Sequence, residues 1–97
     1  MDLSIVIPAY EEGQKIARDI KAGAQFLRSN HLSGEIIVVD DCSEDDTADA
    51  ARKVYVPPEI RLEVIRYEPH HGKGYAVRTG MKATTGQYVM FADCGLC

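Results

Sequence analysis

Four short apolar runs lie along the chain, at residues 4–8, 36–39, 61–67 and 88–92, and they predict four strands. The second run is an unbroken row of isoleucine and valine, which is typical of a strand buried on both faces of a parallel sheet. The third alternates polar and apolar residues and predicts a more exposed strand at the edge of the sheet. Pro8 is expected to end the first strand, because proline lacks the N–H that a ladder needs.

The three intervals between the runs predict helices. Apolar residues recur at helix spacing in the first interval: Ile16, Ile20, Ala24 and Leu27. Glu11 and Glu12 are expected in the first turn of this helix, where acids suit the helix dipole. Ser43 to Asp46 match a capping box, so the second helix is expected to begin near Glu44 and to stop before the prolines at 57 and 58.

The third helix follows a polar loop, residues 68–73, and Gly86 is expected to stop it. The inward faces of the second and third helices are expected to carry apolar and small residues: Thr47, Ala51, Val54, Tyr55, Ala76, Val77, Gly80 and Met81.

The resulting β-α-β-α-β-α-β order predicts a single α/β domain with a mostly parallel sheet between two helical layers. The predicted strand order is 3-2-1-4, with a switch point between the first and fourth strands. Ligands of open α/β sheets bind at the carboxyl ends of the strands. This topology would bring residues 8–10, Asp40, Asp41 and Asp93 to one crevice, where the acids indicate a polar ligand.

Composition and charge narrow the class of protein. Of the 97 residues, 45% are hydrophobic and 27% are charged, as expected of one soluble globular domain. No apolar run approaches the ~20 residues of a membrane span. The net charge of −4 argues against nucleic-acid binding. Three cysteines without a paired framework suggest a reducing compartment, with the cytoplasm as the default.

Four segments together resemble a known family. Residues 4–12 read SIVIPAYEE and residues 36–43 read IIVVDDCS, and both resemble the start of family 2 glycosyltransferases of the GT-A fold. Residues 72–81, GKGYAVRTGM, and 86–93, GQYVMFAD, resemble more narrowly the branch that makes dolichyl- or polyprenyl-phosphate sugars. The resemblance implies that residues 1–97 form the nucleotide-sugar-binding half of an enzyme that transfers a sugar, with inversion, from a UDP- or GDP-sugar.

The resemblance places Pro8, Ala9 and Tyr10 around the base and ribose of the nucleotide, with Glu12 nearby. The flat face of Tyr10 suits a base, because both are polarizable. The alternative is an ordinary helix entrance, with an aromatic residue covering the strand end and an acid in the first turn.

Asp40 and Asp41 are expected to have different tasks, because adjacent strand residues point to opposite sides. Asp41 is expected to accept a charge-assisted hydrogen bond from a ring N–H of the base, while Asp40 braces the loop. The alternative is that both form only a loop-and-cap pair before Ser43.

The Gly72-Lys73-Gly74 turn does not match a Walker motif or a complete G-x-G-x-x-G. Lys73 and the backbone N–H groups beside it are expected to meet the diphosphate. The alternative is a glycine turn with a solvated lysine. His70 and His71 precede the turn, and no role is assigned to them, because adjacent histidines in a loop more often face solvent than bind metal.

Asp93 is the expected metal ligand. The family ends this strand in Asp-x-Asp, which bridges Mg²⁺ or Mn²⁺ to the diphosphate and so neutralises the leaving group. Here Gly95 replaces the second acid, so weaker metal binding is expected. Cys94 and Cys97 form a C-x-x-C that ends the chain, and neither redox nor metal function is favoured for it.

No catalytic residue is assigned within this chain, because the general base is expected downstream, and the chain alone is expected to be inactive. The expected acceptor is a polyprenyl or dolichyl phosphate, and the expected location is the cytoplasm or the cytoplasmic face of a membrane. The existence of a homo-oligomer is left open. Two alternatives remain: a noncatalytic nucleotide-binding or regulatory module, and an interaction domain that a partner completes.

Overall fold

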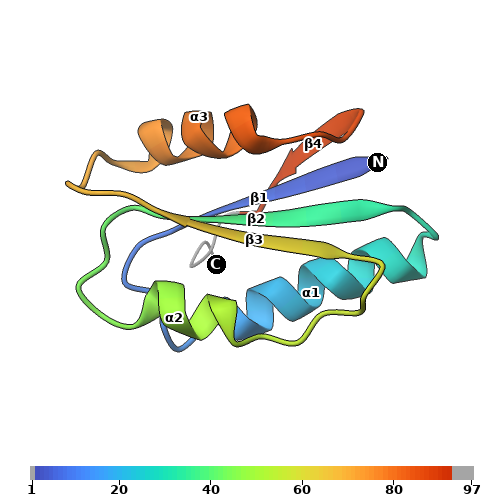
Figure 1. Cartoon of the computed structure of the whole chain (residues 1–97), viewed down its shortest axis with the longest axis horizontal. Helices are drawn as coiled ribbons and strands as arrows, with labels where there is room; N and C mark the ends of the chain where they lie inside the picture. Colours follow the sequence, from blue (N-terminus) through green and yellow to red (C-terminus); the bar gives the residue numbers. More distant parts are fainter. Residues whose placement is uncertain (1, 93–97) are drawn as a thin grey trace.

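The computed structural model describes residues 2–92, with four strands and three helices in that range (Figure 1). The elements follow the predicted order: β1 (Leu3–Ala9), α1 (Ile16–Ser29), β2 (Gly34–Asp40), α2 (Thr47–Arg52), β3 (Arg61–Arg66), α3 (Lys73–Ala83) and β4 (Tyr88–Phe91).

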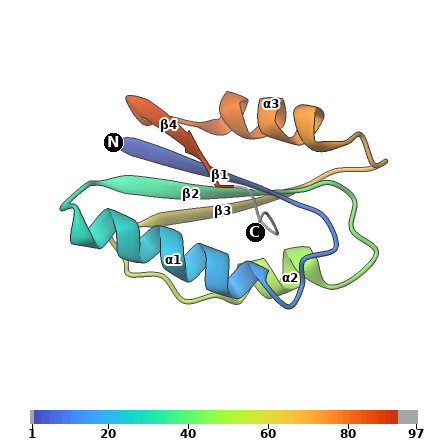
Figure 2. The same cartoon turned by 180° about the vertical axis from the view of Figure 1, so that it is seen from behind.

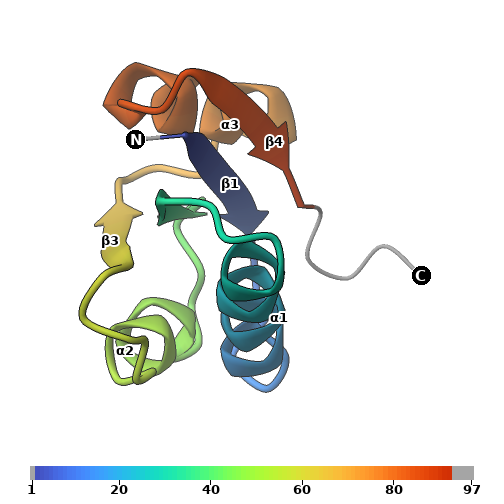
Figure 3. The ribbon, with the colours of Figure 1, turned by 90° about the vertical axis from the view of Figure 1, so that its right-hand side faces the viewer.

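The strands form one parallel sheet in the order β3-β2-β1-β4, which confirms the predicted topology. Helices α1 and α2 cover one face and α3 covers the other, so the domain has three layers (Figure 3). Every residue of β1 and β2 is buried, whereas β3 is partly exposed, as expected of an edge strand. The loops that follow β1, β2 and β3 lie at the same edge of the sheet, on the left of Figure 1 and the right of Figure 2.

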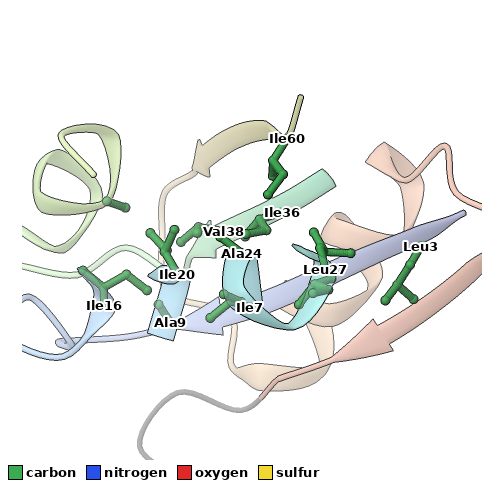
Figure 4. Packing of buried hydrophobic residues seen from close by; sticks show 12 residues of the cluster. Leu3, Ile7, Ala9, Ile16, Ile20, Ala24, Leu27, Ile36, Val38 and Ile60 are labelled. Atoms are coloured by element: carbon green, nitrogen blue, oxygen red, sulfur yellow. The ribbon is translucent and has the colours of Figure 1, made fainter. Parts of the chain in front are cut away.

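Alternate residues of the two central strands build the core on both faces of the sheet. On one face, aliphatic residues of β1 and β2 pack against the apolar stripe of α1: Ile5, Ile7, Ile36 and Val38 meet Ile16, Ile20, Ala24 and Leu27 (Figure 4). On the other face Val6, Ile37 and Val39 pack against Ala76 of α3. Gly80 lets α3 approach this face closely, because a Cβ there would lie 2.4 Å from Val6 Cγ1.

Both helix starts on the α1 and α2 side were predicted wrongly. Helix α1 begins at Ile16, so Glu11 and Glu12 precede it. Helix α2 begins at Thr47, not near Glu44, and the side chain of its N-cap residue, Asp46, makes no capping hydrogen bond. The hydroxyl of Ser43 does not serve as a cap because it donates to Asp40 at 2.5 Å and accepts from the N–H of Glu11 at 2.7 Å.

Three further details differ from the predictions. Tyr55 is 76% exposed, because α2 ends at Arg52 and the helical spacing no longer applies. Met81 is 48% exposed, since Ala76 and Gly80 form the buried side of α3. Gly86 lies beyond the end of α3, where its N–H donates to Ser4 Oγ at 2.9 Å.

The amino edge of the sheet contains a buried acid that the sequence reading missed. Glu35 is fully buried and accepts three hydrogen bonds of 2.6 Å, from Ser4 Oγ, Arg61 and the N–H of Thr85. Burial by itself raises the pKa of Glu35, but these hydrogen bonds outweigh it, so the pKa is lowered. The carboxylate therefore ties β2 to β1, to β3 and to the turn before β4.

Candidate functional site

A pocket of about 140 Å³ lies at the carboxyl ends of β1 and β2. Residues from three separate segments line it: Pro8, Ala9, Tyr10, Glu12, Asp41, His70, Lys73 and Ala76. Six of the seven predicted site residues are among them, and the seventh, Asp93, lies outside the described residues. Small-molecule sites commonly span ~300–1,000 Å³, so this pocket holds only part of such a ligand.

Asp41 is the most constrained polar group of the pocket. It is 3% exposed and directly follows β2. Its Oδ1 accepts from the Tyr67 hydroxyl and, at 2.9 Å, from the N–H of His71. Its Oδ2 accepts from the N–H of Gly72 at 2.8 Å and lies 2.7 Å from His70 Nδ1.

These contacts keep Asp41 ionised. Burial raises its pKa, but the hydrogen bonds from Tyr67, His71 and Gly72 outweigh it, so the pKa of Asp41 is lowered. Burial and the hydrogen bond to Asp41 raise the pKa of the Tyr67 phenol, so Tyr67 remains a hydrogen-bond donor.

The segment that carries His70 and Lys73 is fixed in place by Asp41 and by a glycine. Gly72 has a φ of 92°, a backbone conformation that favours glycine, and it immediately precedes the first residue of α3, Lys73. Lys73 thus lies at the amino end of a helix of 11 residues, where the helix dipole contributes partial positive charge. Lys73 and the amino end of α3 therefore bring positive charge to the lining of the pocket.

Tyr10 also lines the pocket and is 45% exposed. Its ring centroid lies 4.5 Å from that of His70, with the planes inclined by 48°. The loop after Tyr10 is held on α2, because the N–H of Glu12 donates to Thr47 Oγ1 at 2.9 Å and the Glu11 carboxylate accepts from the N–H of Glu44 at 3.1 Å. The position of Tyr10 is thereby fixed by contacts distant in sequence.

Asp40 points to the other face of the sheet, as expected of a residue adjacent to Asp41. Its Oδ1 accepts from both the N–H and the hydroxyl of Ser43, at 3.0 and 2.5 Å. This confirms that Asp40 braces the loop. Its Oδ2 has no hydrogen bond, and its charged neighbour is Arg66, whose Nε lies 3.7 Å away.

Sequence reasoning missed the two side chains that meet Asp41, namely Tyr67 and His70. Each lies 26 or more residues from Asp41 along the chain, so no local spacing connects them. His71 stacks on Tyr75, with centroids 4.0 Å apart, rather than projecting freely into solvent. The pair of histidines before Gly72 was the only signal in the sequence.

Residues 2–92 contain no group of three His, Cys, Asp or Glu side chains that could hold a metal ion. The acid expected to bind metal, Asp93, and the C-x-x-C lie beyond that range. No helix in residues 2–92 is long and apolar enough to cross a membrane.

A parallel 3-2-1-4 sheet with a pocket at its carboxyl edge is the arrangement of a nucleotide-binding α/β domain. The model of glycosyl transferase family 2 matches residues 4–94, and the chain belongs to this family.

Relatives and solved structures agree with this assignment. The chain is 35% identical to the dolichyl-phosphate beta-glucosyltransferase of Saccharomyces cerevisiae, over 94% of this chain and 29% of that protein. It matches Staphylococcus aureus TarS in complex with UDP-GlcNAc with a TM-score of 0.81 and 28% identity, over 97% of this chain and 26% of TarS.

It also matches the Mycobacterium tuberculosis glucosyl-3-phosphoglycerate synthase in complex with Mn²⁺, UDP-glucose and phosphoglyceric acid. That match has a TM-score of 0.76 and 27% identity, over 99% of this chain and 34% of the other. The fold is thus the predicted GT-A type. The chain spans about 30% of the length of the relatives it matches.

Proposed function

We propose that the chain binds a UDP- or GDP-sugar in the pocket at the carboxyl edge of the sheet. In this proposal residues 1–97 are the nucleotide-sugar-binding half of an inverting glycosyltransferase. The observation that carries it is the convergence of Tyr10, Asp41 and Lys73 on one pocket in a member of family 2. TarS and the glucosyl-3-phosphoglycerate synthase, which match with TM-scores of 0.81 and 0.76, bind UDP-sugars.

Each pocket residue has a chemical task in this proposal. Pro8 and Ala9 shape the pocket floor, Tyr10 stacks on the base, and Asp41 accepts a hydrogen bond from a ring N–H of the base. Glu12 lies near the ribose. A separate element, the amino end of α3 with Lys73, meets the negative charge of the diphosphate.

The chemistry of transfer needs negative charge on the departing nucleoside diphosphate to be neutralised, and a bound divalent cation would supply this. The described residues do not fit a metal ion by themselves, so we assign contact with Mg²⁺ or Mn²⁺ to Asp93 alone. With Gly95 in place of a second acid, metal binding is expected to be weak.

We propose a polyprenyl or dolichyl phosphate as the acceptor, because the dolichyl-phosphate glucosyltransferases are relatives. The acceptor oxygen would attack the anomeric carbon from the side opposite the nucleotide, with inversion. No described residue is assigned as its general base, and we expect the 97-residue chain to bind the donor without turnover. The location proposed is the cytoplasm or the cytoplasmic face of a membrane; a homo-oligomer remains an open prediction.

Calorimetry with UDP, GDP and UDP-glucose tests the binding step. Tyr10→Ala should weaken binding by about 1–3 kcal/mol, roughly 5- to 150-fold, because base stacking on an aromatic ring is worth that amount. Tyr55→Ala is the matched control, since Tyr55 is 76% exposed and does not line the pocket. Equal affinities for the two variants and the parent chain would contradict the assignment of the pocket.

A second function is favoured by one observation, the glycine at position 95. A noncatalytic nucleotide-binding module would bind nucleotide independently of metal and would be indifferent to Asp93→Ala. An enzyme-like site would bind more tightly with Mn²⁺ and lose that gain in Asp93→Ala. No nucleotide binding under any condition would favour an interaction domain completed by a partner.

A further inference from the structure

The imidazole of His70 lines the pocket and contacts Asp41 and Tyr10, the two residues to which the proposed function assigns the nucleobase. Its Nδ1 lies 2.7 Å from Asp41 Oδ2 and 3.2 Å from the backbone oxygen of Asp41, so this nitrogen faces two acceptors and carries the proton. Its ring centroid lies 4.5 Å from that of Tyr10. His70 is thus a planar ring that directs an N–H at Asp41 and contacts Tyr10. The proposed function assigns these same two contacts to the nucleobase.

Asp41 has no acceptor site left for a second ring N–H. A carboxylate offers about four lone-pair sites. Four donors surround it: the Tyr67 hydroxyl, the N–H groups of His71 and Gly72, and Nδ1–H of His70. Two of these are backbone groups, and Tyr67 packs against the core on the α3 face. The His70 side chain is 52% exposed and can rotate into solvent, so it is the donor that a ligand can replace.

We propose that His70 is an internal competitor of the nucleobase, which rotates out of the pocket when a nucleotide binds. This inference rests on the proposed function and adds a regulatory element to the same site. The competing state lowers the apparent affinity for every nucleotide by the same factor, because His70 must leave before any base-specific contact forms. Removing the imidazole should therefore tighten the binding of UDP and GDP equally, by about two- to tenfold, the scale of one hydrogen bond from a half-exposed side chain together with one ring contact.

Calorimetry on the full 97-residue chain tests this with His70→Ala. The matched control is His31→Asn: His31 is exposed in the loop before β2, at the other edge of the sheet, and asparagine tolerates its φ of 54°. We expect lower dissociation constants for both UDP and GDP in His70→Ala and unchanged values in His31→Asn.

If His70→Ala binds UDP and GDP no more tightly than the parent chain, the inference is overturned and the proposed function stands. Tighter binding of only one of the two nucleotides has the same consequence. If neither the parent chain nor any variant binds nucleotide, the proposed function and the inference fall together.

A second measurement needs no variant. The ring protons of Tyr10 and His70 should give a nuclear Overhauser effect in the free chain, and this signal should disappear when UDP saturates the site. The stacked rings of His71 and Tyr75, 4.0 Å apart, provide the internal control, because their signal should persist. A Tyr10–His70 signal that survives saturation overturns the inference.

Discussion

Replacing Glu35 by alanine should lower the free energy of unfolding by about 3–5 kcal/mol, the cost of breaking a buried, hydrogen-bonded charge pair. The carboxylate is fully buried and accepts from Ser4, Arg61 and Thr85, so the variant leaves two neutral donors and a guanidinium without their acceptor. Arg61 is 48% exposed and can be rehydrated, which places the expected loss near the lower end. Even that is a large share of the ~5–15 kcal/mol typical of a domain.

Urea unfolding followed by far-ultraviolet circular dichroism measures this loss. The matched control is Glu63→Gln, because Glu63 pairs with the same Arg61 but is 33% exposed, and its loss should cost less than ~1 kcal/mol. Glu35 lies at the edge of the sheet opposite the pocket, so the folded variant should keep the parent's nucleotide affinity. A loss below ~1 kcal/mol for Glu35→Ala would refute the reasoning.

The same carboxylate should make stability depend on pH. The pKa of Glu35 is lowered in the folded state, since its hydrogen bonds outweigh the effect of burial. Its contribution is therefore fully present above the unfolded pKa, about 4.3, and is lost as the pH falls through the folded pKa. Glu35→Gln should show a shallower loss of unfolding free energy between about pH 5 and pH 3 than the parent chain. Identical slopes would exclude Glu35 as a source of the acid sensitivity.

Three further substitutions and one control test the pocket and the packing around it. In Asp41→Asn an NH₂ group replaces one carboxylate oxygen and opposes two of the four donors that surround the side chain. Nucleotide affinity measured by calorimetry should therefore fall at least tenfold, about 1.4 kcal/mol or more. Gly80→Val should cost about 1–3 kcal/mol in urea unfolding because its Cβ would clash with β1, whereas Gly74→Ala, with only ordinary contact at 3.8 Å, should change stability little. Ser43→Ala removes the hydroxyl that donates to Asp40 and accepts from the N–H of Glu11, while the backbone N–H of residue 43 can still donate to Asp40; it should cost about 1–3 kcal/mol in the same assay.

The sheet was predictable because its signals are local and repeated. Unbroken aliphatic runs mark β1 and β2 as central, the alternation in residues 61–67 marks β3 as an edge, and right-handed crossovers then leave few strand orders. The start of α2 was not predictable in this way. Ser43 matches a capping box, but its hydroxyl is engaged by Asp40 and by the N–H of Glu11, 32 residues away, and sequence spacing does not encode that contact.

The same distinction between local signals and long-range contacts applies to the residues of the pocket. Tyr10 and Asp41 follow strands, so topology alone places them at one edge. The roles of Tyr67 and His70 depend on hydrogen bonds to Asp41 across 26 and 29 residues, from a loop without periodicity. A loop residue of this kind is found only when its partner's position is known.

Asp40 and Asp41 explain how three loops are held together around the pocket. Asp40 accepts a hydrogen bond from the hydroxyl of Ser43, and the same hydroxyl accepts one from the N–H of Glu11. These contacts link the loops after β1 and β2. Asp41, on the opposite face, fixes the backbone from His71 to Gly72 and with it the start of α3. Because the side chains of adjacent residues diverge at a strand end, one dipeptide organises both faces of the carboxyl edge. Both acids thus have a structural role there, and Asp41, the one that contacts His70, is the one at which we propose that a ligand replaces a partner.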